Sequence, residues 1–111
     1  MTDQTDLTIP LSQLVFDGDN LARATAKGWD AVQVGALLQH VIRRQAEQAL
    51  KRGALFSVSV TFDVSADAAT DDEIVFESRI DRRTRTLVFS SGTAMQGDRH
   101  LLKATIVYRI G

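Results

Sequence analysis

Arginine is the residue type whose spacing in this sequence most clearly points to a chemistry. Four of the thirteen basic residues fall within seven positions, at Arg79, Arg82, Arg83 and Arg85. They directly follow residues 53–78, a stretch with six acids and no Lys or Arg. Because the planar guanidinium binds phosphate through paired hydrogen bonds, the cluster predicts a local phosphate site on a neutral protein. The alternatives are a solvated hairpin end and pairing with the acids of residues 67–72 across a dimer.

Few other side chains offer acid–base or nucleophilic chemistry. Asp17 and Asp19 lie in a run of turn formers, residues 17–20, and serve a turn more readily than a reaction. Gln39 falls within a predicted helix, where it either bonds a neighbouring backbone group or lines a site. The hydroxyl residues between positions 57 and 61 have no histidine and acid at matching positions, so we expect no hydroxyl nucleophile.

The composition excludes several classes of protein. The 111 residues suffice for one domain, 1–111, with a single core. Thirteen Lys and Arg against fourteen Asp and Glu give a net charge of −1, so we expect neither nucleic acid nor a membrane surface as partner. The absence of cysteine excludes disulfides and thiol chemistry, and with two histidines we expect no metal site. Residues 1–6 are polar and resemble no secretion signal, which predicts a disordered start and a cytoplasmic protein.

The hydrophobic pattern predicts one long helix and several strands. We expect an edge strand within residues 1–16, one or two helical turns in 21–28, and a helix from an N-cap at Asp30 to about Arg52, stopped by Gly53. Strict alternation then predicts strands at 55–64, 73–80, 84–95 and 100–110. Their short connections favour an antiparallel meander, so the fold class is α+β, with a sheet covering the helix.

The predicted helix has three kinds of face. A broad apolar stripe should meet the sheet; it comprises Ala31, Val34, Leu37, Leu38, Val41, Ile42 and Ala49, with Gln45 near its middle. A polar face is solvated. The third stripe is small or apolar, so it lets a second backbone or a ligand approach closely; it comprises Val32, Gly35, Ala36, Gln39, Ala46 and Leu50. A helix with so little solvated surface favours enclosure by a curved sheet, and pairing of the sheet edges favours a dimer.

Three stretches resemble the hotdog thioesterases of acyl-CoA metabolism. The first strand after the helix, 55–64, is similar to the family's corresponding strand, 77–89 to its basic hairpin, and 97–108 to its closing strand. The resemblance implies a hotdog fold, an antiparallel sheet of about five strands wrapped around one long helix. It covers the C-terminal half of the chain better than the N-terminal third.

The resemblance also implies roles for particular residues. Family members hold the thioester carbonyl with N–H groups at the start of the helix, which correspond here to Val34 and Gly35. Gln39 stands where the family's helix has an acid, and Gln33-Val34-Gly35 replaces the usual His-Gly-Gly. Asp17 or Asp19 resembles the acid that other members carry before the helix. In this reading the CoA phosphates contact the basic hairpin, through Arg82, Arg83 and Arg85.

The expected activity is hydrolysis of an acyl-CoA thioester at a dimer-interface tunnel, in a homodimer or a dimer of dimers. No cofactor is expected beyond the CoA moiety of the substrate. Because glutamine is neither a nucleophile nor a base at neutral pH, the alternative is a protein that binds acyl or aromatic ligands, or serves assembly, without catalysis. A monomeric helix-wrapped sheet, like that of cystatins or nuclear transport factors, is a third interpretation.

Overall fold

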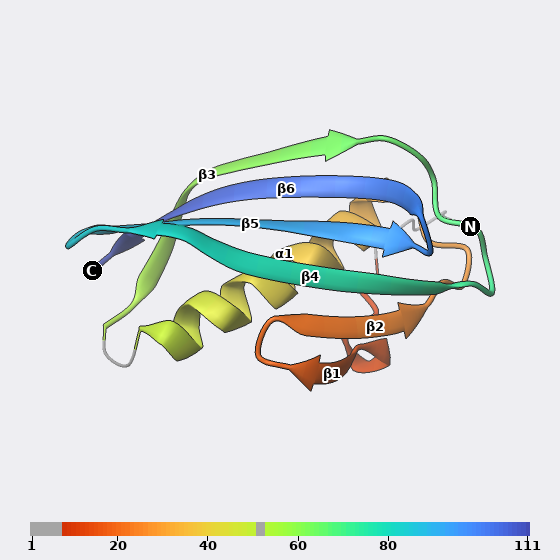
Figure 1. Cartoon of the computed structure of the whole chain (residues 1–111), viewed down its shortest axis with the longest axis horizontal. Helices are drawn as coiled ribbons and strands as arrows, with labels where there is room; N and C mark the ends of the chain where they lie inside the picture. The colour runs from red at the N-terminus through yellow and green to blue at the C-terminus, as the bar shows by residue number, and fades with distance from the viewer. Residues whose placement is uncertain (1–7, 51–52) are drawn as a thin grey trace, which may run out of the picture.

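One long helix lies against a curved, six-stranded antiparallel sheet in the computed structural model, which describes residues 8–50 and 53–111 (Figure 1). This confirms the expected α+β arrangement, with six strands in place of about five. The predictions for residues 1–6 and for a helix end at Arg52 concern positions outside the described residues. In chain order the elements are η1 (Leu11–Gln13), β1 (Val15–Gly18), β2 (Leu21–Thr25), α1 (Ala31–Ala49), β3 (Leu55–Val64), β4 (Glu73–Arg83), β5 (Leu87–Gln96) and β6 (Arg99–Ile110).

The strand order is β1-β2-β4-β5-β6-β3, so the prediction of a four-strand meander is wrong for β3. β4, β5 and β6 do follow one another, but β3 pairs with β6 and forms an edge of the sheet. The loop 65–72 makes this possible, because it crosses the end of the sheet to bring the chain from β3 to β4. The Gln96 amide fixes that loop by bonding the N–H and the carbonyl of Ala69, both at 2.8 Å.

Residues 21–25 form strand β2, so the helical turns predicted for 21–28 are wrong. Alanine is the best helix former, which made this segment resemble a helix. The decisive feature is the two-residue alternation of burial: Ala22 and Ala24 are buried, whereas Arg23 and Thr25 are exposed. Pairing along β4 supplies the backbone hydrogen bonds, and the small alanines let the strand lie close to the rest of the core.

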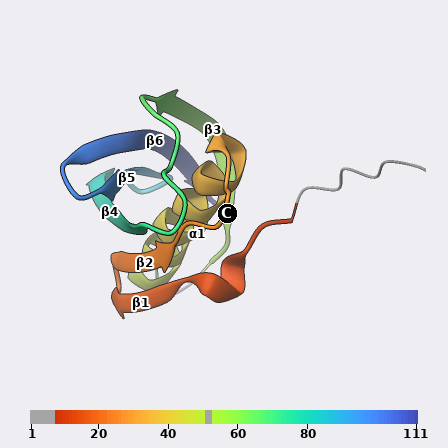
Figure 2. The same ribbon diagram turned by 90° about the vertical axis from the view of Figure 1, so that its right-hand side faces the viewer.

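The helix begins where the sequence predicts. Asp30 is the N-cap, its carboxylate accepts a hydrogen bond from the N–H of Gln33 at 2.9 Å, and the Gln33 side chain accepts one from the N–H of Asp30 at 3.0 Å. This reciprocal capping box fixes the first turn. The predicted apolar stripe is buried from Val34 to Ile42, whereas its two ends are not: Ala31 is half-buried and Ala49 is exposed. Ala46 and Leu50, assigned from the sequence to the stripe of small residues, belong to the core instead. Figure 2 shows the sheet curving around the helix.

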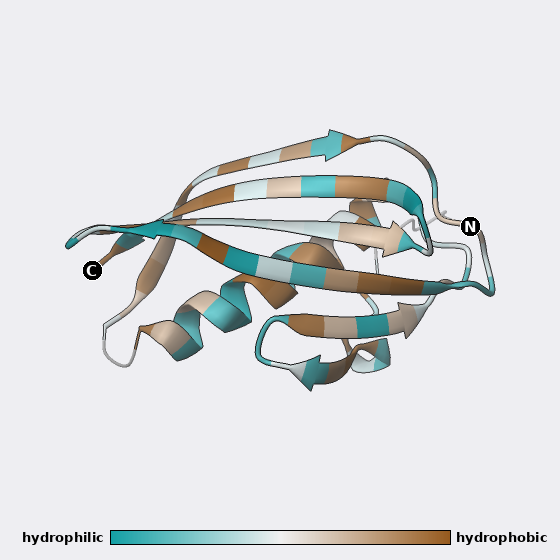
Figure 3. Cartoon of the chain, in the orientation of Figure 1, coloured by the Kyte–Doolittle hydropathy of each residue, from teal (hydrophilic) through white to brown (hydrophobic). Residues whose placement is uncertain are grey.

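Strand β3 leaves an apolar edge uncovered in the single chain. The predicted strict alternation is wrong at its start, because a bulge between Ser57 and Ser59 puts Phe56 on the outer face beside Arg109, while Val60, Phe62 and Val64 lie on the helix side. The apolar side chains are also more open than expected: Phe56, Val58, Val60, Phe62 and Val64 are 38–55% exposed. Figure 3 shows that brown, hydrophobic positions recur along this edge strand. A long apolar edge with free backbone groups is a template for pairing with another strand.

Candidate functional site

An apolar groove of about 290 Å³ runs between the first turns of α1 and the end of β3. Helix residues form one wall, and Phe62, Val64 and Leu102 form the other. The helix wall consists of Ala31, Val32, Gly35, Ala36 and Gln39. Four of these five belong to the stripe of small residues in which the sequence predicts close approach of a ligand or a backbone.

Gly35 and Phe62 define the floor of the groove. A Cβ added at Gly35 would lie 3.4 Å from the Phe62 ring, so glycine lets the aromatic ring rest directly on the helix backbone. The site residues predicted from the sequence include Gly35 but not Phe62, Val64 or Leu102. The alternation of 55–64 puts Phe62 and Val64 on one face, and only the fold shows that this face meets the helix and that Leu102 of β6 lies beside it.

Gln39 is the one groove-lining residue with a polar side chain, and it is half-buried. Its amide has both a donor and an acceptor, so it can orient a carbonyl oxygen or a water molecule. The lining residues include no carboxylate, imidazole or hydroxyl. Within this chain, the groove therefore combines apolar contact with a single neutral hydrogen-bonding group.

The hydrogen-bond donors at the start of the helix differ from those expected. The N–H of Val34 donates to the carbonyl of Asp30 at 3.0 Å, which leaves it without a free proton for a ligand. Gly35 lies one residue deeper in the helix, where N–H groups bond the preceding turn. The Asp30 and Gln33 N–H groups are taken by the capping box. By helix geometry, the donors that remain in this turn are those of Ala31 and Val32, both groove-lining residues.

The two candidate acids do not line the groove. Asp17 lies on β1, where its carboxylate pairs with Arg23 at 3.1 Å, and Asp19 lies in the β1–β2 turn. β1 instead covers the polar side of the helix: the guanidinium of Arg44 lies 3.8 Å from the centre of the Phe16 ring. Within one chain, the fold separates these carboxylates from Gln39.

The basic hairpin lies at the opposite end of the helix from the groove. Arg83 donates to the carbonyl of Ala49 at 3.3 Å, at the end of α1. Ala49 is ten residues beyond Gln39, or about 15 Å along the helix axis. Arg82 lies 5.9 Å from the centre of the Phe89 ring, and Arg79, farther along β4, pairs with Asp81. Arg83 and the hairpin that carries it are thus remote from the groove, while Arg82 and Arg79 contact other parts of the sheet.

Charge divides between the two ends of the sheet. The arginine end, defined by Arg82, Arg83, Arg85 and Arg109, surrounds the β4–β5 hairpin and the start of β3. The acidic end surrounds the loop after β3 and the β5–β6 turn, and consists of Asp63, Asp67, Asp71, Asp72, Glu73 and Asp98. Lys27, paired with Asp71 at 3.0 Å, and Arg99 offset part of this acidity. The groove opens at the acidic end.

Tyr108 is a buried group outside the groove. Its side chain is fully buried, and its hydroxyl has no hydrogen-bond partner among the described residues. Burial raises its pKa to about 12, because the ionised phenol loses its hydration. The nearby Arg43 guanidinium, 5.6 Å from the ring centre, opposes this shift only in part.

No protein-family model matches the chain, and no curated protein matches it. Solved structures do. AziG of S. sahachiroi aligns with a TM-score of 0.80 at 17% identity, covering 90% of this chain and 91% of that one. Zebra fish thioesterase superfamily member 2 aligns at 0.77 and 9% identity, covering 88% and 80%. The tesB protein of Mycobacterium avium subs paratuberculosis aligns at 0.76 and 16% identity, covering 89% of this chain and 40% of that one.

These alignments span nearly the whole described chain at low identity, so they show the fold. The chain has the hotdog fold of thioesterase-like proteins, as the sequence predicts. Within the described part of the chain, no helix is long and apolar enough to cross a membrane. The same residues contain no group of three or more His, Asp or Glu side chains that could hold a metal ion.

Proposed function

We propose that this hotdog protein acts on acyl-CoA thioesters, with the acyl group lying in the groove between α1 and β3. The observation that carries the proposal is the groove itself: about 290 Å³, walled by small and apolar side chains, with the Gln39 amide as its polar group. An uncharged acyl chain or aromatic acyl group suits such a lining, because burying it removes apolar surface from water on both sides.

A second copy of the chain completes the site in this proposal. A two-fold axis perpendicular to the sheet pairs β3 with its counterpart antiparallel and keeps both helices on the same side. The half-exposed side chains on the helix side of β3, Val60, Phe62 and Val64, then become buried, and each groove is closed by the partner. The same axis places the arginine end of one subunit beside the acidic end of the other, so the two charge distributions attract.

The proposed reaction uses groups at both ends of the helix. The N–H groups of Ala31 and Val32 hold the thioester oxygen, where the positive end of the helix dipole also favours developing negative charge. Gln39 orients the water that attacks the carbonyl carbon. Arg82, Arg83 and Arg85 hold the CoA phosphates at the arginine end, and the long pantetheine arm of CoA suits a separation of this order. The attack breaks the C–S bond and releases the acid and the CoA thiol. Asp17 and Asp19 lie by β1, the sheet edge opposite β3, so in this dimer they remain remote from both grooves and the proton of the water passes to the departing sulfur through solvent.

The absence of a carboxylate from the groove lining favours a second candidate, binding of an acyl or aromatic ligand without hydrolysis. In that case Gln39 bonds the ligand carbonyl and no base is present to activate water. The two candidates share the groove and the dimer and differ only in turnover.

A panel of short, medium and aromatic acyl-CoAs, followed by free-thiol detection and by calorimetric binding, tests both candidates. Release of CoA above the rate in buffer supports hydrolysis. Binding without release supports the second candidate. Failure of every member of the panel to bind or to turn over would refute the proposal. Asp17→Asn and Asp19→Asn variants then show whether either carboxylate contributes a base.

A further inference from the structure

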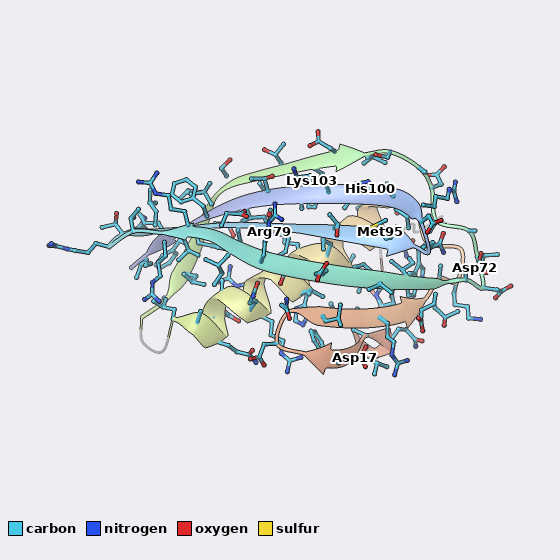
Figure 4. All side chains as sticks on the ribbon, in the orientation of Figure 1. Asp17, Asp72, Arg79, Met95, His100 and Lys103 are labelled. Carbon is cyan, nitrogen blue, oxygen red and sulfur yellow. The ribbon has the colours of Figure 1, made fainter. Side chains whose placement is uncertain are left out.

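A second cavity, of about 420 Å³, lies on the face of the sheet that points away from α1. Ser78 of β4 points toward the helix and donates to Gln45 at 2.8 Å, so its neighbours Glu77 and Arg79 project from the opposite face. The cavity is also lined by Ser91 and Thr93 of β5 and by His100 and Lys103 of β6. Figure 4 shows Arg79, His100 and Lys103 on this outer face, in front of the helix.

Arg79 is oriented for an anion. Its Nε donates to the Asp81 carboxylate at 2.7 Å and to the Ser91 hydroxyl at 3.1 Å. The two contacts share the single N–H of Nε, and they leave the two terminal nitrogens of this largely exposed side chain for a ligand. Paired terminal N–H groups are the arrangement that matches two oxygens of a phosphate.

Lys103 adds a second cation across the sheet. The strand register places Thr93 between Glu77 and Lys103, so a carboxylate and an ammonium flank one hydroxyl. Asp63 lies beside Lys103 on β3, but neither Lys103 nor Glu77 takes part in an ion pair among the described residues. Both groups therefore keep hydrogen-bonding capacity for a ligand.

The imidazole of His100 borders the same cavity. Its Nδ1 lies 3.5 Å from the hydroxyl of Ser65, which leaves Nε2 for another contact. The cavity thus has nitrogen donors on β4 and β6, hydroxyls on β5 between them, and one carboxylate acceptor. Phosphate alone would use the donors and be repelled by Glu77. A phosphate attached to a sugar uses both, because sugar hydroxyls donate to a carboxylate.

From this arrangement we infer that the outer face is a binding site for a sugar phosphate, as found in a nucleotide. Arg79 and Lys103 hold the phosphate, and Glu77 accepts from a sugar hydroxyl. The sheet separates this cavity from the apolar groove, which lies on the helix side. A ligand in the outer cavity therefore cannot place a thioester in the groove of the same chain, and the outer site is separate from the proposed acyl site.

Titration of the full chain with ribose 5-phosphate, inorganic phosphate, ADP and CoA, followed by amide NMR, tests the inference. We expect ribose 5-phosphate to shift the amides of residues 91–93 and 103 and not those of Gly35 and Gln39. We also expect it to bind more tightly than inorganic phosphate. Shifts confined to the 82–86 hairpin, or no shift at millimolar ligand, would overturn the inference, whatever the outcome of the acyl-CoA panel.

Variants assign the roles. Arg79→Gln and Lys103→Gln should each weaken ribose 5-phosphate binding about fivefold, because each removes a charged donor at a solvent-facing site. Glu77→Gln should reduce the preference for ribose 5-phosphate over phosphate. Lys27→Gln removes the same charge outside the cavity and serves as the control. Equal loss in Lys27→Gln and Lys103→Gln would mean a nonspecific charge effect and would overturn the site.

The remaining comparison identifies the source of the sugar phosphate. Equal affinity for ADP and CoA, with no groove amides shifted, assigns the site to a free nucleotide. Tighter binding of CoA assigns it to the nucleotide part of a CoA ester. Both results support a sugar-phosphate site, and thermal melting of each variant confirms that the fold is retained.

Discussion

Val60→Lys should dissociate the dimer that we propose to form through β3. Four apolar side chains of this strand beyond the Phe56 position, Val58, Val60, Phe62 and Val64, are 38–55% exposed in the single chain. Full burial of a Val or Phe side chain contributes about 1.5–3 kcal/mol, so covering the exposed part contributes about 1 kcal/mol per side chain. With four such side chains on each subunit, the gross gain is about 8 kcal/mol. That value is comparable with the association cost of about 4–15 kcal/mol, so the dimer is sensitive to small losses.

The substitution removes about 1 kcal/mol of apolar burial from each subunit and places two ammonium groups near the two-fold axis, since Val60 lies near the middle of β3. The loss of apolar burial on both subunits, about 2 kcal/mol in total, raises the dissociation constant about 30-fold. Repulsion between the two ammonium groups raises it further. Sedimentation velocity over a concentration series measures the change. Thr61→Lys is the matched control, because the next residue carries the same new charge on the outer face of the same strand. A folded Val60→Lys variant that dissociates no more than Thr61→Lys would refute the reasoning.

Three further predictions concern the groove and the core. Gln39→Glu should give or increase thioester hydrolysis by supplying a carboxylate, whereas Gln48→Glu, on the exposed side of the same helix, should not; free-thiol release measures both. Gly92→Ala should lower the free energy of unfolding by about 1–3 kcal/mol, because the new Cβ would lie 2.8 Å from the Glu77 carbonyl and 2.9 Å from Ile42; urea denaturation checks this. Tyr108→Phe removes a buried hydroxyl without a partner and should stabilise the fold by about 1 kcal/mol at pH 7. Because the folded-state pKa of Tyr108 is raised to about 12 from 10, the wild type should lose stability as pH rises from 10 to 12, and thermal melts of Tyr108→Phe should lack this loss.

The sequence predicted most of the elements because their signals are local. Asp30 and Gln33 form a capping box three residues apart, and the alternation over 55–64 predicts the bounds of β3, although a bulge between Ser57 and Ser59 changes its phase. The segment 21–25 was misread because alanine favours helices when no partner strand is considered. Its conformation depends on pairing with β4, about fifty residues away in the chain.

The candidate site divides in the same way. The small-residue stripe on the helix identified Gly35 and Gln39, because spacing alone places them on one face. The stripe does not reveal what lies opposite. Phe62 meets Gly35 only because β3 pairs with β6 at the edge of the sheet, and not with β4 as a meander would require.

By itself, the sequence determined a near-neutral chain with one long capped helix, strongly alternating strands and an arginine hairpin. These properties depend on composition and on side-chain periods of 3.6 and two residues, which act over a few positions. The tertiary structure alone decided that Arg83 lies about 15 Å from Gln39 along the helix, and that Asp17 pairs with Arg23 away from the groove. It also placed Arg79 and Lys103 on one cavity of the outer face. Such distances depend on strand order and on loop crossings, which a local pattern does not contain.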